Sequence, residues 1–434
     1  MNAIDSQQQI VDLQINAKTV MPFDPNQKEL LFNHSVLIND GTIVDILSSD
    51  QVASKYQAKT VVELGQHTLL PSFNNHYCSI GFKAFHHIGS DLPLNLRIQN
   101  KIQPLETKHL SPELASISSE LGLADLFRAG CAQFSSQYSY PKQAMEVANK
   151  HSVEALIYYS IDVSDDRQTF QHQLTEFLKL RDETKHRQNI ELGLSLSNPE
   201  LLTKDQLNSF SGLYNELMIK LLISLNPSFH RSHKSFKSSK ARFKLLKEHH
   251  LLSPDLHLID VFGLSRQEVS FLSKNKVKSI VCPCAQLIHA NALSPVDFLH
   301  STNANLYIGT NNYLSSNLNP LKELQLLAWL TKLESQNAQL FDAKALLGFA
   351  VHSNNLDTPL TSGAMSIGAK ANITAFEHAN QYTNDYDPFT QIVYTAEQSR
   401  ISHLWVNGIA KVKAYQLTDI DEQYLTKTLS KWLN

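Results

Sequence analysis

The chain of 434 residues has few charged residues and almost no net charge. Charged residues make up 18% of it, the formal net charge is -3, and the sequence pI is near 6.7. Proteins that bind nucleic acid or anionic membranes through charge carry an excess of positive residues. The composition therefore gives no reason to expect nucleic acid or a membrane as a partner.

Long hydrophobic runs and cysteines are also scarce. No run reaches the 18 apolar residues that would indicate a membrane-spanning helix. The first six residues lack both the basic start and the apolar stretch of a signal peptide. Only four cysteines are present, Cys78, Cys131, Cys282 and Cys284, and Cys282 and Cys284 lack the two-residue spacing typical of zinc sites. We expect a reducing cytoplasmic location and buried structural thiols.

Apolar residues are plentiful by contrast. They make up 42% of the chain, which is enough for a large buried core. A barrel of about 250 residues plus one smaller module would account for the length. We therefore expect two domains.

The order of apolar segments predicts where these domains lie. Both ends of the chain carry short strand-like segments, such as residues 11–15, 35–38 and 371–376, whereas residues 68–360 alternate short apolar strands with longer amphipathic helices. This alternation is typical of βα units around a parallel sheet. The expected architecture is an α/β protein with a (β/α)8 TIM-type barrel at residues 68–360 and a small β-sandwich domain formed by residues 1–67 with 361–434.

Six short segments, in this order, carry a resemblance to a known family. They are residues 69–76 (LLPSFNNH), 90–94 (SDLPL), 104–106 (PLE), 306–310 (LYIGT), 387–389 (DPF) and 403–408 (HLWVNG). On these segments the chain resembles the amidohydrolase superfamily, in the branch of triazine hydrolases and methylthioadenosine/S-adenosylhomocysteine deaminases. The resemblance extends over nearly the whole length.

The resemblance implies a metal-dependent hydrolysis. In that family a zinc or iron ion at the C-terminal mouth of the barrel acidifies a water molecule, which attacks an amidine-like carbon. The ligands implied are a His-x-His after the first strand, a His on the fifth and an Asp on the eighth. A Glu near the fifth strand moves protons, and a His on the sixth polarises the nucleophile.

Most of these positions hold other residue types in this chain. The first-strand pair falls on His76 and Cys78, the fifth-strand ligand on Ser224, and the eighth-strand carboxylate on Asn311. The remaining positions put Pro227 at the proton-moving Glu, Asp260 at the polarising His, and Ser197 at a substrate-facing His. Serine and asparagine oxygens are poor zinc ligands. We therefore expect a degenerate metal site, with pocket candidates His76, Cys78, Ser197, Ser224, Asp260 and Asn311.

Three functions follow as hypotheses. The first is an amidohydrolase-like protein that has lost metal-dependent activity, a pseudoenzyme that binds a small molecule or another subunit. The second is an active aminohydrolase or deaminase on a nucleoside-like or triazine-like C–N substrate, with a metal site rebuilt from His76, Cys78 and Asp260. The third is a different, metal-free reaction in the same pocket that uses Cys78, His76 or Asp260.

Cofactors and partners follow from the same hypotheses. The first hypothesis requires no cofactor, and the second requires zinc or iron. Since members of the family commonly form dimers, the resemblance implies a homo-oligomer or a partnership with an active relative.

Overall fold

A computed structural model of the whole chain describes residues 8–86, 88–161, 167–226, 238–311, 318–351, 363–378, 387–395 and 400–433. The chain forms two compact units. One contains residues 1–74, 126–133 and 343–420, and the other contains residues 75–125, 134–342 and 421–434. We keep the limits of 1–67 with 361–434 and of 68–360 as a prediction, because a compact unit need not coincide with a unit that folds by itself.

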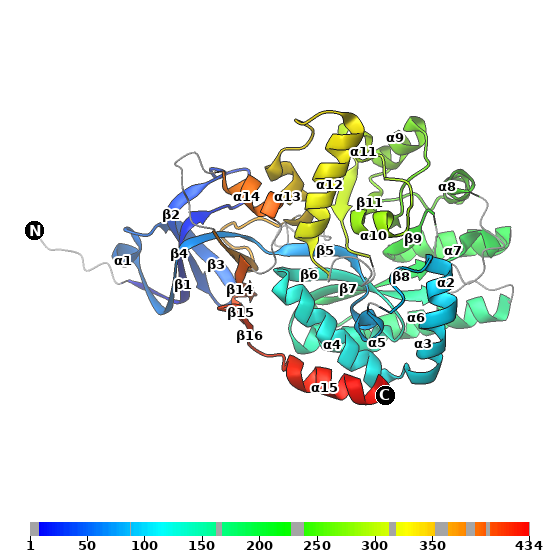
Figure 1. Cartoon of the computed structure of the whole chain (residues 1–434), viewed down its shortest axis with the longest axis horizontal. Helices are drawn as coiled ribbons and strands as arrows, with labels where there is room; N and C mark the ends of the chain where they lie inside the picture. Colours follow the sequence, from blue (N-terminus) through cyan, green and yellow to red (C-terminus); the bar gives the residue numbers. More distant parts are fainter. Residues whose placement is uncertain are drawn as a thin grey trace, which may run out of the picture. The chain divides into compact units, whose positions relative to one another are not determined.

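The larger unit is built on the predicted barrel (Figure 1). Its eight parallel strands follow one another in chain order around the sheet: β5 (Phe73–Cys78), β6 (Cys131–Gln137), β7 (Glu154–Ile161), β8 (Ile190–Leu196), β9 (Leu221–Ser224), β10 (Leu256–Ile259), β11 (Lys278–Val281) and β12 (Asn305–Ile308). The last strand meets the first through a parallel bridge between Cys78 and Asn311. This confirms the (β/α)8 architecture.

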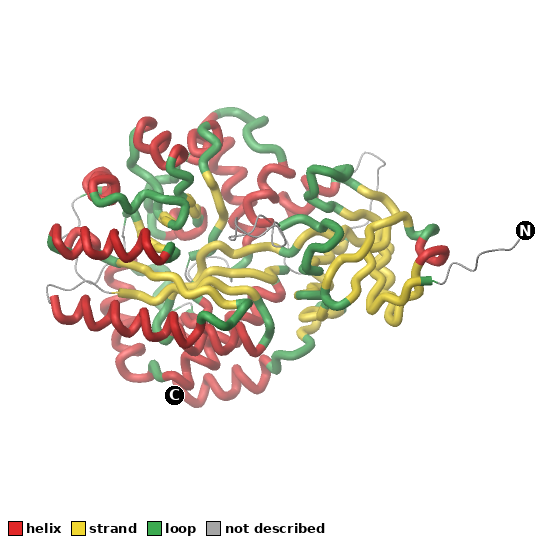
Figure 2. The backbone as a smooth tube through the Cα atoms, turned by 180° about the vertical axis from the view of Figure 1, so that it is seen from behind, coloured by secondary structure: helices red, strands yellow, loops and turns green. Residues whose placement is uncertain are grey.

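Helices alternate with these strands, and Figure 2 shows them in red around the yellow strands. The helices between and after the strands are α4 (Pro112–Arg128), α5 (Pro141–Lys150), α6 (Arg167–Thr184), α7 (Lys204–Leu217), α8 (Ser239–Glu248), α9 (Arg266–Lys274), α10 (Pro283–Ile288), α11 (Val296–Ser301) and α12 (Pro320–Ser335). Between β5 and α4 the chain forms the short 3-10 helix η1 (Ile80–Phe85), helix α2 (Leu94–Arg97), the π turn η2 (Ile98–Ile102) and helix α3 (Gln103–His109). Helix α15 (Glu422–Leu433) also groups with this unit.

Local sequence signals explain where individual helices begin and which face they bury. Ser265 caps helix α9, since its side chain accepts from the backbone N–H of Glu268 while the Glu268 side chain accepts from the N–H of Ser265. In α12 the residues Leu321, Leu324 and Leu327 are buried and recur on one face.

The barrel interior is filled mainly by side chains from its strands. The buried cluster contains Tyr77, Leu156, Tyr158, Leu222, Ile259, Ile280, Cys282, Ala285 and Tyr307. Apolar and aromatic side chains of this size fill the inside of an eight-stranded barrel, so that it is a packed core and not a pore. Space for a ligand is therefore found at the barrel mouth.

The smaller unit is a mixed sheet made from both ends of the chain, as predicted. Its strand order is β16-β15-β14-β13-β4-β1-β2-β3, with β1 (Gln9–Val20), β2 (Leu31–Asn39), β3 (Thr42–Ser48), β4 (Tyr56–Pro71), β13 (Ile373–Glu377), β14 (Ile401–Val406), β15 (Ile409–Lys413) and β16 (Gln416–Leu417). Helices α1 (Val52–Lys55), α13 (Ala343–Val351) and α14 (Pro388–Thr395) complete the unit. Asp40 and Gly41 join β2 to β3 with φ of 49° and 71°, the left-handed backbone that a two-residue hairpin requires.

Helices long and apolar enough to cross a membrane do not occur in the described parts of the chain.

Candidate active site

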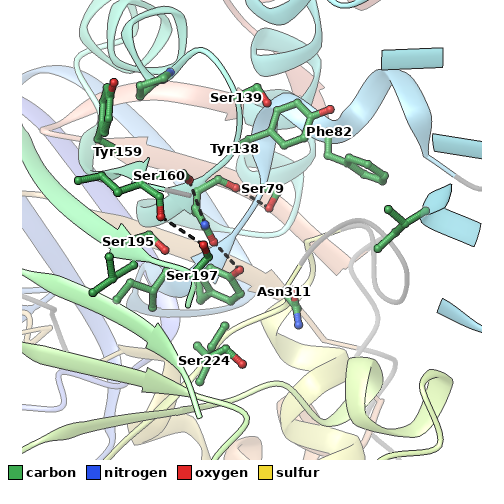
Figure 3. Close-up of a pocket in the computed structure, with 18 of the residues that line it drawn as sticks. Ser79, Phe82, Tyr138, Ser139, Tyr159, Ser160, Ser195, Ser197, Ser224 and Asn311 are labelled. Atoms are coloured by element: carbon green, nitrogen blue, oxygen red, sulfur yellow. Dashed lines mark hydrogen bonds between the residues drawn. The ribbon is translucent and has the colours of Figure 1, made fainter. Parts of the chain in front are cut away.

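A cavity of about 510 Å³ opens at the carboxyl ends of the barrel strands. Much of its polar lining comes from residues at or just after the strand ends: Tyr77, Ser79, Gln137, Tyr138, Ser160, Ser195, Ser197, Ser224, Asp260 and Asn311. Figure 3 shows the serine hydroxyls arranged around this space. In barrels of this type the strand ends at this face carry the reactive groups.

Ser224 and Asp260 are directly linked in this cavity. The Ser224 hydroxyl donates to Oδ2 of Asp260 over 2.7 Å, since Ser224 ends strand β9 and Asp260 follows the neighbouring parallel strand β10. Asp260 has a φ of 56°, which ends the extended strand and turns its side chain out of the strand alternation. Asn226 fixes this backbone by donating to the Asp260 carbonyl over 2.7 Å.

The Asp260 carboxyl group lines the cavity, and its pKa is shifted from that of a carboxyl group in water. Burial raises its pKa to about 6, and the hydrogen bond from Ser224 opposes that rise. Desolvation disfavours the charged form of a carboxyl group, which is the cause of the shift. A carboxyl group with a pKa near 6 can take up and release a proton close to neutral pH.

A second hydrogen-bonded chain crosses the cavity from strand β5 to strand β7. The Tyr77 hydroxyl donates to Oε1 of Gln137 over 2.9 Å, and Nε2 of Gln137 donates to Ser160 over 3.0 Å. Burial, with the nearby Asp260 charge, raises the pKa of Tyr77 far above its ordinary value. Tyr77 is therefore a neutral donor that orients Gln137.

The structure brings four of the predicted pocket residues to one cavity: Ser197, Ser224, Asp260 and Asn311. Ser197 donates its hydroxyl hydrogen to the Ile161 carbonyl over 3.2 Å. Asn311 has a φ of 57° and donates its backbone N–H to Tyr77. Pro227 lies outside the described residues.

His76 and Cys78 do not line the cavity. The His76 ring is fully buried and lies 4.5 Å, centroid to centroid, from the Tyr307 ring. The Cys78 thiol is also fully buried and donates to the Ser135 carbonyl over 3.3 Å. Burial raises the pKa of this thiol far above its ordinary value, so that it is held in the protonated form.

These positions test whether His76, Cys78 and Asp260 fit a metal ion. Cys78 is engaged with Ser135 and Asp260 with Ser224, and neither His76 nor Cys78 faces the cavity that Asp260 lines. Among the residues that the structure describes, no group of three or more His, Cys, Asp or Glu side chains is placed to hold a metal ion. The arrangement does not fit a rebuilt zinc site, and we assign no reaction step to a metal.

Several lining residues were not among the candidates predicted from the sequence. Tyr77, Gln137 and Ser160 form the hydrogen-bonded chain described above, and Tyr138 donates to Oε1 of Glu106 over 2.5 Å. Side chains alternate along a strand, so that with Tyr77 facing the cavity its neighbours His76 and Cys78 face away from it. The Tyr77 carbonyl accepts from the N–H groups of both Thr310 and Asn311. In the sequence, the polar residues Gln137 and Ser160 at the ends of the apolar β6 and β7 segments could have indicated that these positions line the cavity.

Comparisons with known proteins agree with this architecture. No family model matches the chain. It is 24% identical over 438 residues to a 5-methylthioadenosine/S-adenosylhomocysteine deaminase from Teredinibacter turnerae, with 97% of each chain covered. It is 23% identical to a 5'-deoxyadenosine deaminase from Methanobrevibacter smithii, which covers 95% of this chain and 94% of that protein.

Solved structures show the same fold. An adenosine deaminase from Xanthomonas campestris with bound zinc superposes with a TM-score of 0.88 at 21% identity, over 98% of both chains. A triazine hydrolase from Arthrobacter aurescens gives a TM-score of 0.82 at 16% identity, over 97% of this chain and 99% of that one. The resemblance to the amidohydrolase superfamily, and to the branch of triazine hydrolases and these deaminases, is confirmed.

Proposed function

We propose that this chain is an aminohydrolase-type protein that takes a nucleoside-like molecule into the cavity at the barrel mouth and hydrolyses an exocyclic C–N bond. The observation that carries the proposal is the cavity itself, with the partly buried Asp260 in its lining beside Ser224. Full-length similarity to deaminases of 5-methylthioadenosine, S-adenosylhomocysteine and 5'-deoxyadenosine supports the substrate class.

Asp260 is the acid–base group in this proposal. A water molecule adds to the amidine carbon of the ligand, and Asp260 takes one of its protons. The protonated carboxyl group then gives that proton to the departing amino group, which leaves as ammonia. The remaining hydroxyl proton moves to the adjacent ring nitrogen, so that a carbonyl replaces the amine. A pKa of about 6 suits both steps near neutral pH.

The other cavity residues bind and orient. Tyr77 holds Gln137, whose amide nitrogen is held in turn toward Ser160. Hydroxyl groups such as those of Ser195 and Ser197 can donate to or accept from the heteroatoms of a purine-like ring. Correct placement of water and substrate supplies a large share of the rate enhancement in any such reaction.

A second candidate function is binding of the same ligand without hydrolysis. The specific observation in its favour is the identity of the residues at the strand ends, where Ser224 and Asn311 stand at positions that the resemblance assigns to metal ligands. In this function the cavity is retained and the reaction is lost.

One experiment separates the candidates. The purified full chain is incubated with 5-methylthioadenosine, S-adenosylhomocysteine and 5'-deoxyadenosine, with and without added zinc, and ammonia release is measured beside binding by calorimetry. We expect turnover that Asp260→Asn lowers by about 10² to 10⁴, with Asp297→Asn, an exposed carboxylate on α11, as the control. Binding without ammonia release would leave the second candidate, and neither binding nor release would sink both.

A further inference from the structure

Arg97 is a buried positive charge in the wall of the cavity. It ends the short helix α2, lines the cavity, and is 2% exposed. Burial lowers its pKa to about 10, which leaves the guanidinium group protonated near neutral pH. A guanidinium group offers five N–H donors in a planar fork and cannot accept a hydrogen bond.

The guanidinium group is held in place by its inner nitrogen. Nε donates to the Ile88 carbonyl over 2.6 Å. The next residue, Gly89, has a φ of 64°, and a Cβ added there would lie 3.5 Å from Cγ of Arg97. The chain at residues 88–89 therefore passes closely over the stem of the side chain. Only glycine adopts such a backbone readily.

Among the residues that the structure describes, the outer part of the same group has no protein partner. The Nη2 atom of Arg97 is buried without a hydrogen-bond acceptor, and Arg97 forms no ion pair with a described carboxylate. A buried charge without a counter-ion is costly, and such groups are normally paired.

The carboxylates that share the cavity with Arg97 are engaged elsewhere. Oε1 of Glu106 accepts from Tyr138, and Oδ2 of Asp260 accepts from Ser224. The pKa of His289 is lowered to about 4, mainly by burial and to a smaller extent by the positive charge of Arg97. His289 is therefore neutral near pH 7, and Arg97 supplies the positive charge on this side of the cavity.

We infer that Arg97 is a specificity-determining residue that binds an anionic group, a carboxylate or a phosphate, on the ligand of this cavity. The inference deepens the proposed function and rests on it, because it adds an acidic substituent to the nucleoside-like ligand. An anionic oxygen would complete the unpaired Nη2 and neutralise the buried charge. Fork-shaped pairing of arginine with carboxylate or phosphate is strong and directional. The charge on Arg97 is thereby used for ligand selection and not for folding.

The test measures, by calorimetry, the affinity of the full chain for three adenosine derivatives. S-Adenosylhomocysteine carries a carboxylate, adenosine 5'-monophosphate carries a phosphate, and 5-methylthioadenosine carries neither. We expect Arg97→Met to weaken binding of at least one anionic compound by about tenfold or more, and to change binding of the uncharged compound by less than about twofold. The anionic compound whose binding is weakened by Arg97→Met shows whether Arg97 binds a carboxylate or a phosphate. Arg266→Met, at an exposed site on α9, is the matched control.

A stability measurement separates selection from a structural role. Because Arg97→Met removes an unpaired buried charge and keeps an apolar stem, we expect the ligand-free variant to melt at or above the temperature of the wild type. Equal weakening of all three compounds, or of none, would overturn the inference. An unfolded Arg97→Met would also do so if Arg97→Lys folds and binds anionic and uncharged compounds alike.

The inference and the proposed function fail in distinguishable ways. If none of the nucleosides binds to the wild type, the proposed function fails. Inorganic phosphate and acetate then serve as probes, since an anion that binds only the folded state raises the melting temperature. Protection that is present in the wild type and absent in Arg97→Met would keep the inference, and no protection would remove it.

Discussion

Ser224 and Asp260, 36 residues apart in sequence, are joined by a 2.7 Å hydrogen bond from the serine hydroxyl to the carboxylate. Each residue stands at the carboxyl end of its strand, and β9 and β10 pair in parallel with Ile259 opposite Ser224. The contact unites two positions that the sequence suggested separately. The pKa of Asp260 therefore depends on Ser224 as well, because the hydrogen bond from Ser224 opposes the rise that burial causes.

The pH dependence of stability tests the state of Asp260. Its pKa is raised from 3.8 to about 6 in the folded chain, so that the folded state binds more protons than the unfolded state between about pH 4 and pH 6. Stability from this group is therefore present below pH 4 and is lost as the pH rises through 6. We expect Asp260→Asn to stabilise the protein by about 1–3 kcal/mol at pH 8 and to change little at pH 4.

Urea unfolding of both chains at pH 4 and pH 8 checks this prediction. Asp297→Asn is the control, because that exposed carboxylate lies on a surface helix. An equal effect of Asp260→Asn at the two pH values would contradict the assignment of a raised pKa.

The Tyr77–Gln137 hydrogen bond is open to a double-mutant cycle. Tyr77→Phe removes only the hydroxyl that donates to Gln137 over 2.9 Å, and we expect a loss of about 1 kcal/mol in the free energy of unfolding. Combined with Gln137→Met, the coupling energy should be about 0.5–1.5 kcal/mol. Urea denaturation of the four chains measures it. Strict additivity would mean that the bond contributes nothing.

Metal analysis tests the position of Cys78. Because its thiol donates to Ser135 and does not line the cavity, we expect Cys78→Ala to leave the zinc content of the purified protein unchanged. Elemental analysis after growth with zinc gives the answer, with the buried Cys131→Ala as the matched control. Stoichiometric zinc in the wild type that disappears in both Cys78→Ala and Asp260→Ala would restore the site of His76, Cys78 and Asp260.

The helix cap at Ser265 provides a prediction on folding alone. Ser265→Ala removes the acceptor for the Glu268 N–H, and we expect it to cost about 1 kcal/mol of stability. Ser265→Asp keeps an acceptor and should retain most of it. Thermal unfolding of the three proteins compares them, and an unchanged melting temperature in Ser265→Ala would show that α9 does not depend on the cap.

The candidate site was partly accessible from the sequence. Ser197, Ser224, Asp260 and Asn311 were predicted as pocket residues, and all four line the cavity. His76 and Cys78 were predicted with them and lie elsewhere, because side chains alternate along β5 and it is Tyr77, between them, that faces the cavity. Their role in metal binding, and the loss of activity inferred from the substituted ligands, stay predictions.

The sequence alone determined the order of strands and helices, the union of the two chain ends in one β unit, and the start of α9 at Ser265. These features depend on local hydrogen bonds and on apolar periodicity, which a linear sequence carries directly. Only the tertiary structure decided that Ser224 meets Asp260, that Tyr77 and not Cys78 faces the cavity, and that Arg97 is buried without a counter-ion among the described residues. Those relationships depend on barrel closure and on single backbone angles, such as the positive φ of Asp260, which arise only when distant segments pack together.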